Sequence, residues 1–300
     1  MCKKIKNYGM SYMGSKSSIV EELIQILPTG KRFVDLFGGG GAVTHAVCEH
    51  INKFQFSLFG QKWESVLYND YNPLVVDLFK KSINGEYNYK NFKPVFITRD
   101  MFQELKSKDG YVKYIWSFGN NGRDYLFNKE IEKDKKSLHN AIIFDVFDDN
   151  FYKILPNFKN FMSTDIKSRR LEIRKYLREV KKRCDVQQLE RLERLQQLEQ
   201  LEQLERLETT NISYLEYHYQ NGDVVYCDIP YQNTCEYDES FNHKQFYDWA
   251  YNADFPVYFS SYEISDNRFK TIFEIPRRST LSSSNNNCYK VEKVYFNSKE

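Results

Sequence analysis

The sequence lacks several features, and each absence excludes a class of protein. It contains no run of about 18 apolar residues, and its mean hydropathy is -0.67, which together exclude a membrane-embedded protein. The first residues lack the apolar core of a signal peptide. The formal net charge is only +2, so the overall electrostatic field does not indicate a polyanionic partner. Any such partner must be bound through local clusters of charge.

Cysteine is also scarce. The six cysteines form no C-x-x-C pair and have no accompanying histidine cluster, which argues against a zinc site. We therefore expect no bound metal, reduced thiols and a cytoplasmic protein. The cysteines are Cys2, Cys48, Cys184, Cys227, Cys235 and Cys288.

A length of 300 residues with 41% hydrophobic residues allows one sizeable α/β core and a smaller inserted domain. Apolar spacing predicts a helix over 17–27 and a strand over 32–37. That strand runs into four glycines and then a helix over 42–52. A second strand, 65–68, precedes a helix that begins at Pro73. The alternation of strands and helices predicts a parallel sheet.

The composition changes along the rest of the chain. Residues 87–186 are rich in aromatic residues, asparagine and lysine, and we interpret them as an insertion between two halves of a catalytic domain, 1–86 and 211–300. Within the second half, 255–260 is expected to be a strand. Residues 187–210 are a low-complexity spacer with leucine at every third position, a period that drifts by about 60° per step around an α-helix. The segment therefore forms no coiled-coil seam. It could be a variable spacer without chemistry or an arm that binds a partner, and the sequence does not decide between the two.

The four glycines, Gly38–Gly41, come directly after the first strand. Glycines at this position let the backbone approach a ligand, while the following helix offers free N–H groups. The turn could bind a dinucleotide or a nucleoside, or could serve tight packing alone. The absence of a G-x-G-x-x-G helix start argues against a pyrophosphate.

Asp70 follows the second strand, about thirty residues after the glycines. A carboxylate there can accept hydrogen bonds from both hydroxyls of a ribose, so the spacing fits a nucleoside. The alternative is a cap for the helix that begins near Pro73.

A further strand, 223–227, delivers Asp228, Ile229, Pro230 and Tyr231 at its carboxyl end. This segment combines an acceptor for an amine, a rigid turn and an aromatic stacking face, which suits a planar ring that carries an amino group. A simple turn with a core tyrosine is the alternative.

Together these segments resemble the Dam-type (class alpha) family of adenine-specific DNA methyltransferases of bacteria and phages. The order along the chain is also that of the family: a lysine segment, a glycine loop, an acidic residue, an insertion and a catalytic tetrapeptide. One residue departs from the pattern, because the family tetrapeptide is Asp-Pro-Pro-Tyr and Ile229 stands in place of the first proline. The matching segments are Tyr12 to Lys16, the Phe-x-Gly-x-Gly of Phe37, Gly39 and Gly41, Trp116 to Tyr125, Asp228 to Tyr231, and Glu292 to Asn297.

The resemblance implies a fold, an activity and a cofactor. The fold is an α/β, Rossmann-like S-adenosylmethionine-dependent methyltransferase sheet with an inserted, mostly helical target-recognition domain. The activity is site-specific methylation of the N6 amino group of adenine in double-stranded DNA. S-adenosyl-L-methionine would be bound by Tyr12, Lys16, Asp35, Phe37, Gly39, Gly41, Asp70 and Asp228. The catalytic residues would be Asp228, Ile229, Pro230 and Tyr231.

We expect the inserted domain to bind DNA. A dense basic stretch suits phosphates, and a polar loop near Asn120 and Arg123 suits the reading of bases, although a solvated helix face would explain the basic stretch as well. The stretch comprises Lys167, Arg169, Arg170, Arg174, Lys175, Arg178, Lys181, Lys182 and Arg183.

Several alternatives stay open at this point. A cytosine-N4 DNA methyltransferase is the nearest, because the same tetrapeptide serves any exocyclic amine. Methylation of RNA or protein agrees less well with the basic insertion, and Ile229 leaves open a catalytically weakened DNA-binding relative. The expected location is the cytoplasm of a bacterium or phage-infected host. The resemblance allows a cognate restriction endonuclease as partner and leaves the oligomeric state undetermined.

Overall fold

A computed structural model of the chain describes residues 6–54, 62–179, 190–232, 241–278 and 289–297. The chain divides into two compact units, which are considered separately. The sheet unit comprises Met1–Gly9, Gly14–Val76 and Leu204–Glu300, and the helical unit comprises Met10–Met13 and Asp77–Gln203. Some residues singled out in the sequence lie outside the described ranges, namely Cys2, Lys181, Lys182, Arg183, Cys184, Leu189, Cys235 and Cys288.

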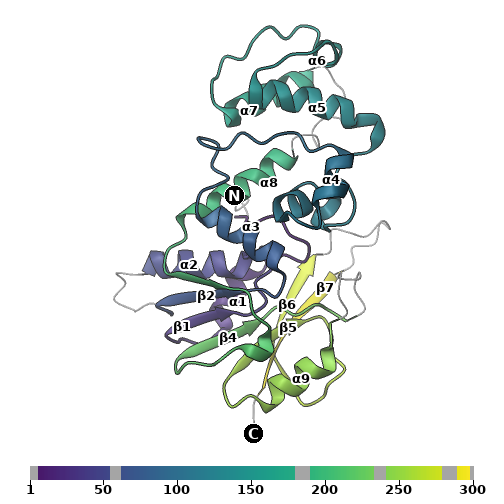
Figure 1. The fold of residues 1–300 in the computed structure, drawn as a ribbon. Coiled ribbons are helices and arrows are strands. Elements are labelled where there is room, and N and C mark those ends of the chain that lie inside the picture. Colours follow the sequence, from purple (N-terminus) through teal and green to yellow (C-terminus); the bar gives the residue numbers. More distant parts are fainter. Residues whose placement is uncertain (1–5, 55–61, 180–189, 233–240, 279–288, 298–300) are drawn as a thin grey trace. The chain divides into compact units, whose positions relative to one another are not determined.

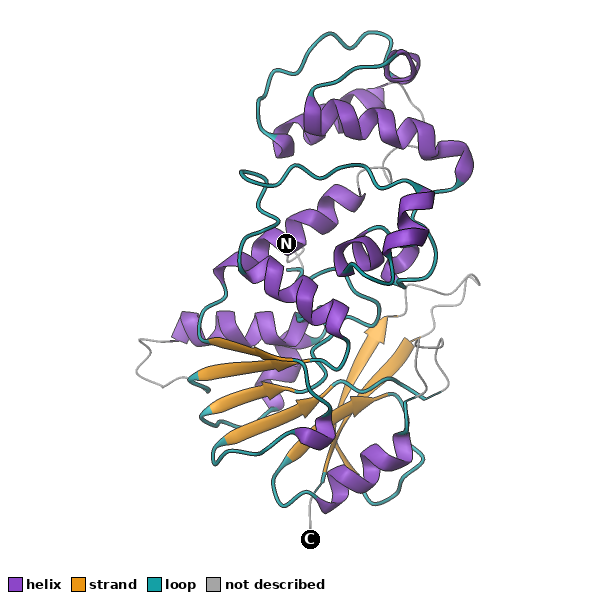
Figure 2. Ribbon diagram, viewed as in Figure 1, coloured by secondary structure: helices purple, strands orange, loops and turns teal. Residues whose placement is uncertain are grey.

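The described strands of the sheet unit form one seven-stranded sheet in the order β3-β2-β1-β4-β5-β7-β6 (Figures 1 and 2). The five strands from β3 to β5 are parallel, whereas β7 is antiparallel to both β5 and β6. This mixed sheet with flanking helices confirms the expected α/β class. The strands are β1 (Arg32–Asp35), β2 (Ser65–Asn69), β3 (Leu207–Thr210), β4 (Asp223–Cys227), β5 (Val257–Ser261), β6 (Lys270–Arg278) and β7 (Tyr289–Phe296).

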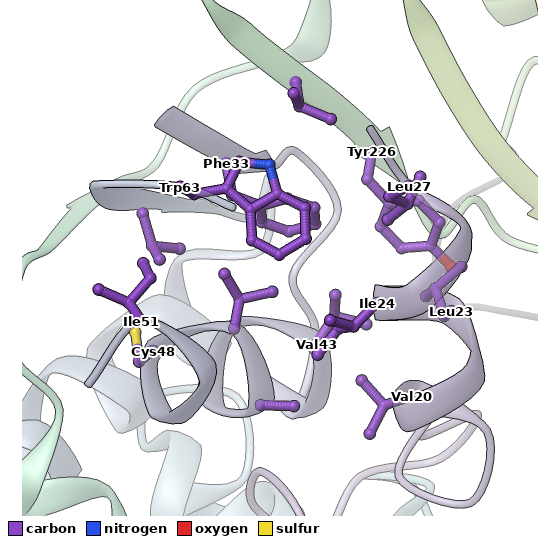
Figure 3. Packing of buried hydrophobic residues seen from close by; sticks show 14 of the residues in the cluster. Val20, Leu23, Ile24, Leu27, Phe33, Val43, Cys48, Ile51, Trp63 and Tyr226 are labelled. Atoms are coloured by element: carbon purple, nitrogen blue, oxygen red, sulfur yellow. The ribbon is translucent and has the colours of Figure 1, made fainter. Parts of the chain in front are cut away.

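Helices cover the sheet on two faces because side chains alternate along each strand. On β1, Phe33 packs into one core cluster and Val34 into the other. Figure 3 shows the first cluster, in which α1 and α2 contact one face of the sheet through residues such as Leu23 and Val43. The second cluster includes Phe246 of α9. The helices of this unit are α1 (Val20–Ile26), α2 (Ala42–Phe54), the short helix η5 (Tyr214–Glu216) and α9 (His243–Asn252), and α3 (Pro73–Ile83) continues into the helical unit.

The elements expected around the glycine turn are confirmed to within three residues at each boundary. The exceptions lie in the second half of the chain. Leu207–Thr210 forms β3 inside the region expected to be a spacer, where it pairs in parallel with β2. Of the two antiparallel strands β6 and β7, only β7 was expected, from the resemblance of its last segment to the family; β6 was not predicted.

The helical unit contains no strand of its own among the residues that are described (Figure 2). Its elements are α4 (Arg99–Leu105), η1 (Tyr111–Ile115), η2 (Phe118–Asn120), α5 (Lys129–Phe144), α6 (Asp149–Ile154), α7 (Ile166–Glu179), α8 (Glu190–Glu199) and η4 (Gln200–Gln203). Side-chain caps begin several of these helices, for example Thr98 for α4 and Asp148 for α6. None of the helices in the described ranges is both long and apolar enough to cross a bilayer.

The leucine repeat is integrated into the packed structure. Leu195, Leu198 and Leu201 are fully buried. Within α8, the buried guanidinium of Arg194 donates hydrogen bonds to the carbonyls of Ile115 and Ser117, at 3.0 and 2.8 Å. The repeat then continues into η4, a 3-10 helix with three residues per turn that contains Leu201.

Candidate active site

The site is built at the carboxyl ends of the parallel strands. β1 leads through Asp35 into the glycine turn, and the N–H of Gly38 donates to the carbonyl of Asn69, at the end of β2, at 2.7 Å. A Cβ at Gly38 would lie 2.3 Å from the buried ring of Tyr68, so a side chain there would require that ring to shift. Gly39 has a φ of 46°, a conformation that glycine adopts easily. The tight turn thus brings the backbone against the neighbouring strand.

Asp70 holds this turn from the end of β2. Its Oδ2 accepts the N–H of Gly39 at 2.8 Å, and its Oδ1 accepts the N–H of Asn72 at 2.8 Å. The cap of α3 is provided instead by Asn72, whose Oδ1 accepts the N–H of Leu74 at 3.0 Å. Burial raises the pKa of Asp70, and the hydrogen bonds from Asn72 and Gly39 oppose that shift. The carboxylate is therefore a fixed acceptor at the glycine turn.

Asp35 is a buried carboxylate beneath the turn. Its Oδ2 accepts the N–H and the hydroxyl of Thr44, at 3.1 and 2.7 Å, whereas Oδ1 has no hydrogen-bond partner among the described residues. Burial raises the pKa of Asp35 to about 7, because the hydrogen bonds from Thr44 only partly offset the loss of water. A buried, unpaired acceptor suits a cationic or hydrogen-bonding ligand.

Asp228 follows β4, the strand that pairs with β1 on the side opposite β2. The ammonium of Lys16, which is 3% exposed, donates to its Oδ1. The hydroxyl of Ser260 on β5 also donates to Oδ1, at 3.4 Å, and is itself 2.8 Å from the hydroxyl of Tyr226. Donors from two other segments therefore orient the carboxylate.

Tyr231 lies in the same cluster. Its ring centroid is 4.7 Å from the ammonium of Lys16 and 4.7 Å from the ring of Tyr262, which it meets edge to face. Its hydroxyl donates a hydrogen bond to Oε1 of Glu292, a fully buried residue on β7. Burial raises the pKa of Tyr231 well above its usual value, and the nearby charges of Asp228 and Glu292 raise it further. The phenol therefore stays neutral, and its hydroxyl donates to Glu292.

The two residues between Asp228 and Tyr231 are anchored in different ways. The Ile229 side chain is 1% exposed and belongs to the same core cluster as Phe246 and Phe259. The carbonyl of Pro230 lies 2.7 Å from Nε2 of His243, at the start of α9. The core and α9 together fix the path of the main chain after β4.

The aromatic residue of the glycine segment is a packing residue in this structure. The Phe37 ring lies 5.6 to 5.7 Å from the rings of Tyr214, Phe241 and Phe246. Gly41 has a φ of 67°, and its N–H donates to the carbonyl of Gly38 at 2.7 Å, which closes the turn before α2.

The polar loop considered for DNA lies in the helical unit and is tightly bonded to itself. Asn120, with a φ of 57°, donates from its amide to the carbonyl of Tyr114 at 2.8 Å. The N–H of Arg123 donates to Oδ1 of Asn121 at 2.8 Å. Tyr12, also in this unit, has its ring centroid 5.1 Å from that of Tyr114. The loop is thus held in one backbone conformation.

The basic residues of α7 are divided between internal contacts and solvent. Lys167 pairs with Glu199 at 2.7 Å, and Arg169 pairs with Asp145 at 3.2 Å. Arg170 is 8% exposed, and Arg174 is half-buried. The exposed cations of the described part of this helix are Lys167, Lys175 and Arg178.

Two residues that contact the catalytic segment were not predicted to be site residues, although Glu292 begins a segment that matches the family. Ser260 is the second-last residue of β5, and nothing in its sequence context marks it. Glu292 offers a signal, because it stands two residues before Val294 on the same face of a strand, and Val294 is fully buried. A carboxylate at a strand position whose neighbours on the same face are buried is rare, so such a residue is a candidate for a functional role.

Neither metal ligands nor disulfides add to this site within the described ranges. No group of histidine, cysteine and acidic residues is arranged there to hold a metal ion. Cys48 and Cys227 are buried free thiols.

One comparison with known proteins identifies a family. The family model for D12 class N6 adenine-specific DNA methyltransferases matches residues 12–254, well over half of the chain. No curated protein matches the sequence.

Proposed function

Because the chain belongs to the D12 class N6 adenine-specific DNA methyltransferases, we propose that Asp228, Ile229, Pro230 and Tyr231 form its catalytic segment. The enzyme transfers a methyl group from S-adenosylmethionine to the N6 amino group of adenine in DNA. The observation that carries the assignment is the position of Asp228. It follows β4 directly beside the glycine turn of β1, and Lys16 and Ser260 fix its Oδ1.

The residues around the glycine turn fit the methyl donor. Asp70 presents acceptors for ribose hydroxyls, since each carboxylate oxygen can accept a second hydrogen bond beyond that from Gly39 or Asn72. The buried Oδ1 of Asp35, which lacks a partner among the described residues, suits a cationic group of the donor. When bound, the donor supplies a methyl group on a sulfonium centre. We assign Lys16, Asp35, Phe37, Gly39, Gly41, Asp70 and Asp228 to this site, and Tyr12 on the family resemblance alone.

Asp228 and Ile229 act on the amino group of adenine. Its lone pair is delocalised into the ring, so it is a weak nucleophile until acceptors draw the lone pair back onto nitrogen. The carboxylate of Asp228 and the carbonyl of Ile229 accept the two N–H bonds and orient the nitrogen. A side chain other than proline at position 229 leaves this carbonyl in place.

We propose double-stranded DNA as the substrate, with the target base flipped out of the stack. Extrusion costs a few kcal/mol, and stacking on Tyr231 can return about 1 to 3 kcal/mol. Contacts to DNA from the helical unit would supply the rest: the exposed cations Lys167, Lys175 and Arg178 are available to phosphates, and Asn120 and Arg123 to bases. We place this activity in the cytoplasm of a bacterial or phage-infected cell, where DNA is accessible.

A single-turnover assay with labelled S-adenosylmethionine and adenine-containing duplex tests the assignment. We expect transfer by the parent enzyme, with N6-methyladenine as the labelled nucleoside. Asp228→Ala should be about 100-fold to 1000-fold slower, while still binding DNA, because it lacks an acceptor that acts as charge develops on nitrogen. Substantial transfer by a folded Asp228→Ala variant would refute the role of Asp228.

A further inference from the structure

We propose that Glu292 is a positioning residue for methyl transfer, which holds Tyr231 and Lys16 in place around Asp228. The proposal rests on the proposed function of Asp228 and Tyr231. It gives a role in the reaction to β7, which lies between β5 and β6 in the sheet and far from the glycine turn in sequence.

Glu292 contacts both neighbours of the catalytic carboxylate through one oxygen. Its Oε1 accepts the hydroxyl of Tyr231 and lies 3.7 Å from the ammonium of Lys16. Lys16 in turn donates to Asp228 and lies 4.7 Å from the centroid of the Tyr231 ring. Glu292, Tyr231, Lys16 and Asp228 therefore form one connected cluster. Each contact of Glu292 is to a side chain that itself contacts Asp228 or forms the proposed stacking face for the base.

The burial of these groups is costly for stability alone. Glu292 is fully buried, and Lys16 is 3% exposed. Removing two ions from water costs several kcal/mol per ion, and an apolar pair of similar volume often stabilises a protein as well or better. Charges in this position are thus better explained by a need to orient groups than by a need to stabilise the core.

Neutralising Glu292 should redistribute Lys16. In the present arrangement the ammonium lies between two carboxylates, Asp228 and Glu292. Without the second carboxylate, Lys16 is attracted to Asp228 alone and competes with the adenine amine for that acceptor. The hydroxyl of Tyr231 also loses its charged partner, so the ring is less firmly oriented. Lys16 and Asp228 are also assigned to the donor site, but the donor keeps Asp35 and Asp70 as acceptors, so the larger loss should be in the rate of transfer and the smaller one in donor affinity.

The chain contains a matched control at the other end of β4. Asp223, the first residue of that strand, is a buried carboxylate that accepts the hydroxyl of Tyr217 and pairs with Arg32 through two hydrogen bonds of 2.9 Å. It has the same composition as the Glu292 set, a carboxylate with a tyrosine and a cation. It lies at the amino end of the strand, whereas Asp228 follows the carboxyl end.

The experiment compares Glu292→Gln with Asp223→Asn in the full chain. Thermal melting reports folding, calorimetry reports affinity for S-adenosylmethionine, and single-turnover transfer to an adenine duplex reports the rate. We expect Glu292→Gln to slow transfer by about tenfold or more while donor affinity changes by less than about threefold. Asp223→Asn should lower the melting temperature without a comparable loss of rate in the folded protein.

A double-mutant cycle with Tyr231→Phe tests whether Glu292 acts through the tyrosine. That substitution keeps the ring and removes the hydroxyl, so the two rate losses should be less than multiplicative in Tyr231→Phe/Glu292→Gln. An unchanged rate in folded Glu292→Gln, an equal loss in Asp223→Asn, or fully multiplicative losses would overturn the proposal. Asp228→Ala is measured in parallel: if it retains transfer, the proposed function itself fails, whereas its loss with an unaffected Glu292→Gln rejects only the role of Glu292.

Discussion

The backbone N–H of Gly39 donates a 2.8 Å hydrogen bond to Oδ2 of Asp70, which joins the turn after β1 to the end of β2. Two segments that are thirty-one residues apart in sequence thereby form one side of the proposed donor site. The other oxygen of Asp70 binds the N–H of Asn72, and Asn72 caps α3. Binding and capping are thus assigned to neighbouring side chains, and they can be tested separately.

Substitution of Asp70 by alanine should chiefly weaken the binding of S-adenosylmethionine. The loss of a charged acceptor for ribose hydroxyls costs about 1.5 to 3 kcal/mol, which corresponds to about tenfold to hundredfold in affinity. Asn72→Ala is the matched control, since it removes the cap of α3 and should lower stability by about 1 kcal/mol with little change in affinity. Calorimetry and thermal melting measure the two effects. Equal affinity in parent and Asp70→Ala would mean that Asp70 only shapes the turn.

Asp35 should make donor binding and protein stability respond to pH in opposite directions. Burial raises its pKa to about 7, above the value in the unfolded chain, so the folded protein binds the additional proton between about pH 4 and 7. Stability attributable to Asp35 is therefore gained as the pH falls through 7. A cationic group of the donor requires the ionised form, so affinity should fall in the same range, by at most about tenfold per pH unit.

The comparison of the parent with Asp35→Asn isolates this effect from titration of the donor itself. Affinity and urea unfolding are measured for both proteins at several pH values between 5 and 8. The difference between the two proteins should vary with pH for each quantity. A pH-independent difference in donor affinity would show that Asp35 does not bind the cationic group of the donor.

Ile229→Pro restores the tetrapeptide of the family and should separate activity from stability. The carbonyl at this position is retained, so the single-turnover rate should stay within about twofold of the parent. The Ile229 side chain is buried in the core cluster of Phe246, and its truncation should cost about 1 to 3 kcal/mol of unfolding free energy. Ile229→Val provides the smaller change in volume. A rate at least tenfold lower in folded Ile229→Pro would show that the main-chain path after β4 depends on isoleucine.

The exposed cations of α7 should affect DNA binding more than the paired ones. Lys175→Ala and Arg178→Ala should each weaken binding to all sequences alike and reduce the salt slope by about 1. Arg169→Ala instead removes a pair with Asp145 and a contact of its guanidinium with the Phe161 ring, so it should mainly lower the melting temperature. Fluorescence anisotropy across a series of salt concentrations measures the slopes. Unchanged slopes for Lys175→Ala and Arg178→Ala would show that these side chains do not contact DNA phosphates.

The residues that were predictable from sequence carry a local signal. Arg32–Asp35, the glycines and Asp223–Cys227 show apolar strands that end in turn residues, so the strands and the positions of Asp70 and Asp228 follow from pattern and spacing. The α/β sheet and the family follow from the same segments.

The remainder depends on partners that are distant in sequence. The pairing of Lys167 with Glu199 and of Tyr231 with Glu292 cannot be inferred from either residue alone. β3 was missed because Leu207 continues a three-residue leucine period, which hides the two-residue alternation of a strand.

The three-residue period of the leucines bears on how the length of this segment can evolve. One triplet added in η4, the 3-10 helix that contains Leu201, lengthens it by a full turn of about 6 Å and leaves the following residues facing the same way. In α8 the same change, if it came before Arg194, would rotate every following side chain by about 60° and displace the buried Arg194 from its carbonyl partners. Natural variants in length should therefore differ in η4 and leave α8 unchanged.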